Sequence, residues 1–201
     1  MAQARVLADR MIPGEGLMWD ALRIAAANLL LVLCARVAIP LPWTPVPITG
    51  QTFGVMLIAV LLGPTRAAVA ISLYLLEGFA GLPVFQPFGP PGPARFIGPT
   101  AGYLLAYPFA AAVSGWLVAK RVFGNAYARV LPLVASLVCG ESVVFLGGCT
   151  WLAVGMHLGW GAAFASGVAP FLPGDAVKIA AVVAVVRSLH LVTPDEVPDV
   201  Q

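Results

Sequence analysis

Long apolar segments dominate this sequence and restrict what it can fold into. Of its 201 residues, 60% are hydrophobic and only 10% are charged, whereas a soluble globular domain carries about 25% charged residues. The chain is long enough for one compact helical domain and leaves no room for a separate soluble domain. No basic tract suggests a nucleic-acid partner. The sequence therefore predicts an all-α integral membrane protein embedded in a lipid bilayer.

Six apolar segments are expected to form transmembrane helices. They cover residues 21–39, 52–62, 66–80, 100–119, 130–154 and 175–186. Because a membrane span takes about 20 apolar residues, the second, third and sixth segments need apolar but irregular neighbours such as 46–51 and 167–172. Non-helical backbone at membrane depth is tolerated only when it is buried or faces a cavity. The short segments therefore predict one water-accessible pocket.

The basic residues predict the orientation of these helices. If six helices alternate, one side of the membrane holds Arg5, Arg10, Arg23, Arg66, Lys120, Arg121, Arg129 and Arg187. The other side holds only Arg36 and Arg95. The positive-inside rule then places both termini in the cytoplasm. We expect residues 1–20 to be a cytoplasmic segment without the apolar core of a signal peptide. Residues 21–189 are expected to form the six-helix membrane domain, and residues 190–201 a cytoplasmic tail.

Two proline-rich loops lie on the predicted outward side. The first, residues 40–47, is expected to be extended because proline fixes φ. The second, residues 81–98, combines many prolines and glycines with Phe85, Phe88 and Phe96. Such aromatic residues form either a lid over an outer pocket or an aromatic belt at the membrane interface. The length and glycines of the loop favour the lid.

Two opposite charges open the last apolar segment. Charged side chains are costly within a membrane and usually mark a cavity or pathway. Asp175 and Lys178 share one helix face because they are three residues apart, and they begin on the outward side. They are the first candidate for a binding site. Alternatively, Asp175 caps the helix, and Lys178 pairs with it or extends to the interface.

Five stretches, in this order, resemble the biotin-specific substrate-capture components of energy-coupling factor (ECF) transporters, the BioY family. They are PVPITGQTF (45–53), LGPTR (62–66), LYLLEGFAGLPVF (73–85), FIGPTAGY (96–103) and FLPGDAVK (171–178). Two positions depart from the family pattern, because Glu77 replaces an apolar residue and Ala101 a more common glycine. Any one stretch is weak evidence, but the ordered set is specific.

The resemblance implies a six-helix S component in a bacterial-type inner membrane that binds biotin from outside. Its partners would be a transmembrane coupling protein and two ATP-binding-cassette ATPases. The chain has no phosphate-binding loop, so ATP would be used only by these partners, and no enzymatic cofactor is expected. The resemblance also implies that Ala21 and Ala25 contact the coupling protein. Internal helix packing explains alanines at this spacing equally well.

Biotin presents ureido N–H donors, a carbonyl acceptor, a thioether ring and a carboxylate tail. The resemblance carries over Asp175 and Lys178 as ligand contacts, Asp175 accepting from the ureido N–H groups and Lys178 donating to biotin. Further candidate contacts are Gln51, Thr52, Tyr74, Phe85, Gln86, Arg95 and Tyr103. Four of them have another explanation: Gln51 and Thr52 can cap a helix, Tyr74 can be a packing residue, and Arg95 can be a solvated charge.

The sequence leaves other functions to consider. A solitary proton-coupled carrier would need an intramembrane carboxylate such as Glu77 or Glu141, and an S component for another vitamin is a related alternative. An intramembrane enzyme is disfavoured because no nucleophile–base pair can be assembled. A metal site is not expected either, because His157 and His190 lack ligand spacing. The three cysteines, in apolar stretches without a CxxC motif, are expected to be reduced packing residues.

Overall fold

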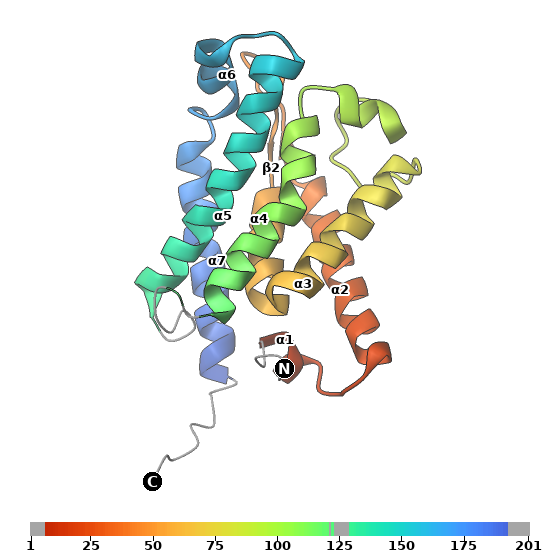
Figure 1. Ribbon diagram of the computed structural model, residues 1–201, viewed down its shortest axis with the longest axis vertical. Helices are drawn as coiled ribbons and strands as arrows, with labels where there is room; N and C mark the ends of the chain where they lie inside the picture. Colours follow the sequence, from red (N-terminus) through yellow and green to blue (C-terminus); the bar gives the residue numbers. More distant parts are fainter. Residues whose placement is uncertain (1–6, 121, 123–128, 193–201) are drawn as a thin grey trace.

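The computed structural model is a bundle of helices (Figure 1) and describes residues 7–120, 122 and 129–192. Arg5, Arg121 and most of the predicted tail 190–201 lie outside the described residues. The α-helices are α1 (Leu7–Met11), α2 (Leu17–Arg36), α3 (Gln51–Phe79), α4 (Ala101–Ala119), α5 (Val130–Thr150), α6 (Trp160–Gly167) and α7 (Leu172–Val192). The shorter elements are β1 (Ala38–Ile39), β2 (Ile48–Thr49), the 3-10 helix η1 (Gly92–Ile97) and the π-helical turn η2 (Trp151–Gly155).

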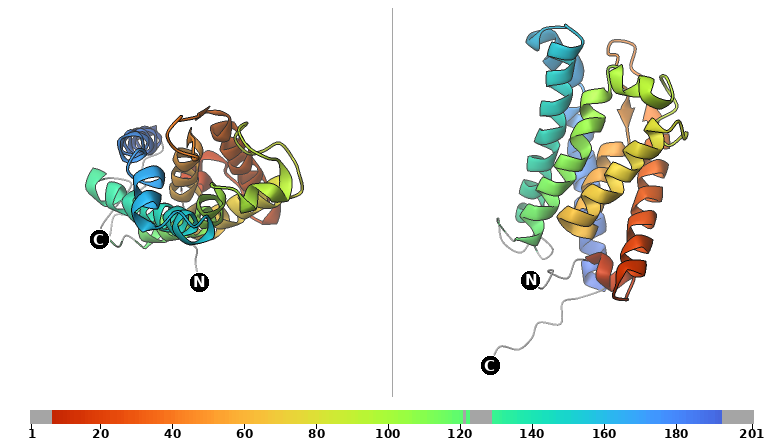
Figure 2. Two further views of the ribbon diagram at one scale, coloured as in Figure 1. Left: turned by 90° about the horizontal axis from the view of Figure 1, so that it is seen from above. Right: turned by 45° about the vertical axis from the view of Figure 1, so that its right-hand side comes forward.

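The two ends of the bundle differ in what they hold. Helix α1 and the C-terminal part of α7 lie at one end, called here the α1 end (Figures 1 and 2). The loops 40–47 and 81–98 lie with α6 at the opposite end, called the loop end. The first loop joins β1 to β2, which pair antiparallel through Ala38 with Thr49 and Ile39 with Ile48. Both proline-rich loops thus lie on one side, as predicted, and the assignment of the α1 end to the cytoplasm stays a prediction.

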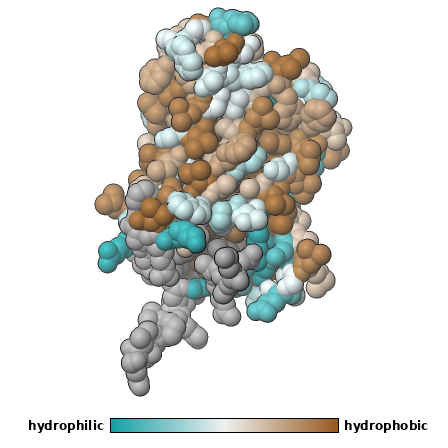
Figure 3. All heavy atoms as spheres, viewed as in Figure 1, coloured by the Kyte–Doolittle hydropathy of each residue, from teal (hydrophilic) through white to brown (hydrophobic). Residues whose placement is uncertain are grey.

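Apolar helices of membrane length make up most of the bundle. In the described residues, four helices are long and apolar enough to cross a membrane, namely α2, α3, α4 and α5 with its extension η2. Helices α6 and α7, bent by 49° at the break between them, form a fifth candidate if they count as one span. In Figure 3 hydrophobic side chains cover the middle of the visible face, and hydrophilic ones gather mainly near the α1 end. The helical membrane fold is confirmed, whereas the number of six crossings stays a prediction.

Helix α3 contains the second and third predicted segments, separated by a sharp break. Gly63 has φ 74° and ψ −179°, a backbone conformation that favours glycine, and Pro64 follows it. The chain descends from β2 to this break and then turns back toward the loop end (Figure 1). A Cβ atom at Gly115 of α4 would lie 2.8 Å from backbone atoms of Gly63 and Pro64. The glycine therefore lets α4 lie directly against the turn.

Two elements near the loop end differ from the sequence expectations. Helix α6 was not predicted, because its eight residues are too few to give a clear hydrophobic period. The last helix begins at Leu172, three residues before the predicted start at Asp175, because the preceding Phe171 carbonyl already accepts a bond from the Asp175 N–H (2.9 Å). Much of the predicted irregular stretch 167–172 is therefore the short turn between α6 and α7.

Four charged residues join α1 to the bundle and are called here the α1 ionic cluster: Asp9, Asp20, Arg23 and Arg66. Arg23 lies 3.4 Å from Asp9 and 2.9 Å from Asp20. Arg66, just after the break in α3, lies 2.6 Å from Asp9 and 2.8 Å from Asp20. Arg23 is only 3% exposed, and it also donates to the carbonyls of Ile12 and Gly14. The cluster fixes the N-terminal segment beneath α2 and α3.

Candidate functional site

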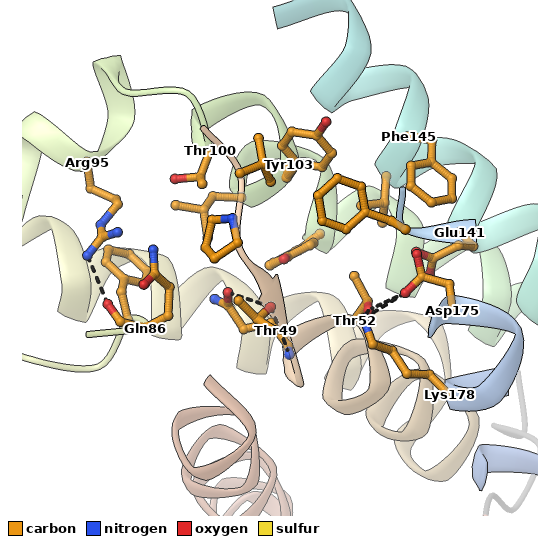
Figure 4. A pocket seen from close by; sticks show the side chains of 18 residues that line it. Thr49, Thr52, Gln86, Arg95, Thr100, Tyr103, Glu141, Phe145, Asp175 and Lys178 are labelled. Atoms are coloured by element: carbon orange, nitrogen blue, oxygen red, sulfur yellow. Dashed lines mark hydrogen bonds and ion pairs between the residues drawn. The ribbon is translucent and has the colours of Figure 1, made fainter. Parts of the chain in front are cut away.

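A pocket lies at the loop end between helices that are distant in sequence (Figure 4). Its polar wall residues are Thr49, Gln51, Thr52, Gln86, Arg95, Thr100, Tyr103, Tyr107, Glu141, Asp175 and Lys178. Its apolar wall residues are Val46, Pro47, Phe85, Leu104, Val144, Phe145 and Phe171. The cavity volume is about 40 Å³. Eight of the nine candidate ligand contacts line this pocket, and only Tyr74 does not.

Asp175, Lys178 and Thr52 form a hydrogen-bonded group at one end of the pocket. The Lys178 Nζ donates to Asp175 Oδ1 (2.7 Å) and to Thr52 Oγ1 (2.9 Å). The Thr52 hydroxyl lies 3.3 Å from the same Asp175 oxygen. The first two turns of α7 supply the ion pair, and the first turn of α3 supplies the threonine. Asp175 is only 4% exposed, and its ion pair with Lys178 lies at the edge of the cavity.

This geometry excludes some of the alternatives to ligand contact, and ligand contact itself stays a prediction. Asp175 is not a helix cap, because α7 begins three residues before it. Lys178 pairs with Asp175, but its Nζ is directed to Thr52 inside the protein rather than extended to the membrane interface. Gln51 and Thr52 do not cap α3 either, because Gly50 occupies the cap position.

Tyr74 lies beneath the pocket rather than on its wall. It is fully buried, and its hydroxyl accepts a hydrogen bond from the Gln51 side-chain amide (2.7 Å). Its ring packs edge-on against Phe85, with the ring centroids 5.1 Å apart. The Gln51 oxygen in turn accepts from the Thr49 hydroxyl (3.1 Å). Tyr74 therefore supports two wall residues from below.

Arg95 fastens the second loop at the other end of the pocket. Its guanidinium donates to the backbone carbonyls of Gln86 (3.0 Å) and Phe88, and it lies 5.7 Å from the centre of the Phe85 ring. The side chain is 5% exposed, so it is not a solvated loop charge. Burial lowers the pKa of the Arg95 guanidinium from its usual value. The Gln86 side-chain oxygen accepts from the Phe88 N–H (2.6 Å), which tightens the same turn.

The aromatic residues of the second loop occupy different environments. Phe85 is buried and forms part of the pocket wall. Phe96 packs against Phe85 and Phe79, with ring centroids 5.8 Å and 5.7 Å apart. Phe88 is exposed. The loop thus covers the pocket with Phe85 and is attached to α3 through the contacts of Phe85 with Tyr74 and of Phe96 with Phe79, as a lid would be, and its movement stays a prediction.

A sequence model of the BioY family matches residues 8–195. The chain belongs to the BioY family. A Rhizobium etli protein named "Biotin transporter BioY" is 39% identical over 144 residues, which are 70% of this chain and 75% of that protein. A Pyrococcus horikoshii protein named "Probable biotin transporter BioY" is 37% identical over 73% of this chain and 82% of its own length. A "Biotin transporter BioY" of Thermotoga maritima is 36% identical, covering 81% and 89%.

A solved structure agrees with this family. The crystal structure of "the S-component for biotin from an ECF-type ABC transporter" matches with a TM-score of 0.75 and 26% identity, covering 88% of this chain and 95% of that one. The resemblance seen in the sequence motifs is therefore confirmed, and so is the ECF S-component fold. Members of the BioY family are transporter components, not enzymes, and the chain is a membrane protein. No group of three or more metal-ligating side chains occurs in the described residues.

Several wall residues of this BioY-family pocket were not among the predicted contacts. The sequence identifies Glu141 only as an intramembrane carboxylate, because its distance along the chain from Asp175 does not indicate that both face one cavity. Tyr107, Phe145 and Phe171 also line the pocket. Within an apolar segment, however, the sequence does not distinguish an aromatic residue on a pocket wall from one in the core. Tyr103 was predicted, and its hydroxyl donates to the Gly167 carbonyl (2.6 Å), which links α4 to α6.

The two predicted partner-contact alanines lie on the outside of α2. Ala21 and Ala25 are exposed, whereas Ala27 and Ala35 of the same helix are buried in the core. Packing within the chain therefore accounts for the second pair and leaves the first pair open to lipid or to another protein.

Proposed function

We propose that this chain is the biotin-binding membrane component of a vitamin uptake transporter, which captures biotin at the loop end and delivers it inward with partner ATPases. The observation that carries this proposal is the hydrogen-bonded group of Asp175, Lys178 and Thr52 on the wall of a pocket that aromatic and aliphatic side chains also line. The membership of the BioY family and the likeness to a solved S component for biotin support the choice of ligand.

The chemistry of the pocket fits the two polar ends of biotin. At one end, Lys178 is a hydrogen-bond donor beside carboxyl groups, which suits a ureido ring that both donates and accepts. At the other end, Arg95 supplies a positive charge for the carboxylate tail. Phe85 and Tyr103 supply apolar surface for the ring system and chain between these ends. Gln51, Thr52 and Gln86 complete the proposed set of contacts, and Tyr74 acts by supporting Gln51 and Phe85.

The pocket must widen to admit this ligand. Sites for small molecules usually have volumes of about 300–1,000 Å³, against about 40 Å³ here. The second loop is the wall segment best able to move, because Gly81, Gly89 and Gly92 adopt positive φ angles that allow the backbone to rearrange. Displacement of Phe85 with this loop would open the pocket toward the outside, and its return would cover bound biotin.

The proposed partners are a transmembrane coupling protein and two ATP-binding-cassette ATPases, with Ala21 and Ala25 on the surface that meets the coupling protein. The proposed location is a bacterial-type inner membrane with both termini in the cytoplasm. In this arrangement residues 21–189 form the membrane domain, flanked by the cytoplasmic segments 1–20 and 190–201. The small, exposed side chains of Ala21 and Ala25 would allow close helix contact.

Direct binding to the purified chain in detergent tests the proposal. Biotin is expected to bind saturably, desthiobiotin to compete, and thiamine to have no effect. Absence of biotin binding, or equal competition by thiamine, would overturn the assignment of the ligand.

Uptake of labelled biotin by cells that lack every coupling ATPase tests the delivery step. Uptake should fail there and return when the coupling module is supplied. Full uptake without the module would favour the solitary proton-coupled carrier instead, for which Glu141 on the pocket wall is the best-placed carboxylate.

A further inference from the structure

The buried polar atoms that lack a partner are concentrated at the pocket. In the described part of the chain, four buried side-chain atoms have no hydrogen-bond partner: Arg23 Nε, Arg95 Nε and both carboxyl oxygens of Glu141. Three of the four belong to residues on the pocket wall. Buried polar groups in proteins are nearly always satisfied, so each exception calls for an explanation. Because these three atoms lie on the wall of one pocket, a single ligand that supplies their hydrogen-bond partners would explain all of them.

The two pocket residues with unpartnered atoms are Arg95 and Glu141. One is basic and the other acidic, and they lie at opposite ends of the pocket. Figure 4 shows Arg95 on one side of the pocket and Glu141 on the other. Arg95 can only donate hydrogen bonds, whereas the carboxyl oxygens of Glu141 can accept them. A ligand that spans the pocket would therefore present an acceptor at one end and a donor at the other. The carboxylate and ureido ends of biotin have this order.

Glu141 is left without a donor by the way its neighbours are already paired. It lies on α5, is 5% exposed, and faces the carboxyl group of Asp175 (Figure 4). Asp175 accepts from the Lys178 ammonium and lies within reach of the Thr52 hydroxyl. The Lys178 Nζ is directed to Asp175 and Thr52. In the described residues no donor from α7 therefore reaches the Glu141 oxygens.

We propose that Glu141 accepts a hydrogen bond from a ureido N–H of the bound ligand, while Asp175 holds Lys178 beside it to donate to the adjacent carbonyl. This inference rests on the proposed function, because it takes biotin as the ligand. The sequence predicts Asp175 alone as the acceptor of the ureido N–H groups, whereas this proposal gives that role to Glu141 and leaves Asp175 to position Lys178. In a cyclic urea each N–H lies next to the carbonyl, and an acceptor next to a donor complements that edge.

The test is a thermodynamic cycle between this side chain and one group of the ligand. Affinities for biotin are measured by calorimetry with the full chain in detergent, together with those for carbamate analogues in which one ureido N–H is replaced by oxygen. In the wild type we expect one of the two analogues to bind at least 10-fold more weakly than biotin. In Glu141→Leu, biotin itself should bind at least 10-fold more weakly, and that analogue should match biotin within about two-fold.

Two controls separate this effect from general damage. Glu77→Leu makes the same change on α3 away from the pocket wall and should leave every affinity unchanged. Biotin methyl ester changes only the far end of the ligand, so its penalty should be the same in the wild type and Glu141→Leu. Glu141→Leu should also unfold at or above the wild-type temperature, because leucine removes a buried group that has no partner.

Three outcomes would overturn one or both proposals, and they are distinguishable. Wild-type affinity for biotin in Glu141→Leu, or equal weakening of biotin and both carbamates, would refute the role of Glu141 alone. If Glu141→Leu fails to fold, Glu141→Gln is measured instead. Its amide keeps one carbonyl acceptor, so its loss of biotin affinity should be smaller than the loss expected for the leucine variant. Failure of the wild type to bind biotin at all would refute the proposed function together with this inference.

Discussion

The α1 end and the loop end of this protein both bury charged side chains, but they leave them in different states. At the α1 end, Asp9 and Asp20 each lie between the same two arginines, and of these four residues only Arg23 Nε is open in the described part of the chain. At the loop end, a carboxyl group and a guanidinium nitrogen face a cavity without partners. We interpret charged groups that bond to one another as part of the fold, and charged groups without a partner as part of a ligand site. Mutations at the two ends should therefore separate stability from binding.

The largest expected effect is on ligand binding at the loop end. Asp175→Ala removes the counter-charge that holds the partly buried Lys178 beside the ligand, and a hydrogen bond to a charged group contributes up to about 3 kcal/mol. Biotin affinity should fall about 100-fold, measured by calorimetry. Asp175→Glu keeps the charge and should restore part of the affinity, which a purely structural role would not require. Unchanged affinity in Asp175→Ala would contradict the site itself.

At the α1 end the matching change should affect stability instead. Arg23→Met keeps an apolar side chain but removes the donor to Ile12, Gly14, Asp9 and Asp20. We expect a loss of about 2 kcal/mol in the free energy of unfolding and a fall of about 4–8 °C in the unfolding temperature. Thermal unfolding in detergent measures this, and biotin affinity should stay within about two-fold. A large loss of affinity with unchanged stability would break the contrast between the two ends.

A smaller effect is expected from a hydroxyl group at the loop end. Thr52→Val keeps the shape of the side chain but removes its bonds to Lys178 and Asp175. A single hydrogen bond contributes about 1 kcal/mol, so biotin affinity should fall about five-fold. Thr52→Ser is the control, since it retains the hydroxyl and should bind like the wild type. An equal loss in both variants would point to the missing or altered methyl contact rather than the hydrogen bond.

The smallest effect is expected from the exposed member of the α1 ionic cluster. The Asp20 side chain is 34% exposed, and exposed ion pairs contribute at most about 1 kcal/mol. Asp20→Asn should lower the unfolding temperature by about 1–2 °C, and the difference from the wild type should shrink in high salt because exposed charges are screened. A loss as large as that of Arg23→Met would show that the cluster depends on both carboxylates rather than on the buried arginine.

Most of the helical fold was predictable because it depends on local properties of the sequence. Apolar runs located the main helices, and Gly63 with Pro64 marked the break inside α3, since glycine allows backbone angles that other residues avoid and proline fixes its own φ. Helix α6 was missed because a single short helix of small residues carries little periodicity. Its place at the loop end depends on distant contacts, such as the bond from Thr44 Oγ1 to the Ser166 carbonyl (2.6 Å).

The site was predictable to the extent that its charges are anomalous in an apolar segment. Asp175 and Lys178 were found on that basis, and motif resemblance added the residues of α3 and the second loop. Glu141 carried the same anomaly but lacked a neighbour in the sequence to give it a role. Its position opposite Asp175 follows from how α5 and α7 pack. Likewise, the backbone bonds that Arg95 makes within its own loop depend on the fold of η1.

The break in α3 has a consequence for how this protein enters a membrane during synthesis. The whole helix has 29 residues, whereas two independent spans would need about 40. Neither half can hold its own place across a bilayer, so we expect the two halves to partition into lipid together, as one helical hairpin with Gly63 at its tip. Arg66 is the first charged residue after that tip, and its charge would keep the hairpin from moving deeper into the lipid. Its contact with Asp9 would form only after the N-terminal segment packs against the hairpin.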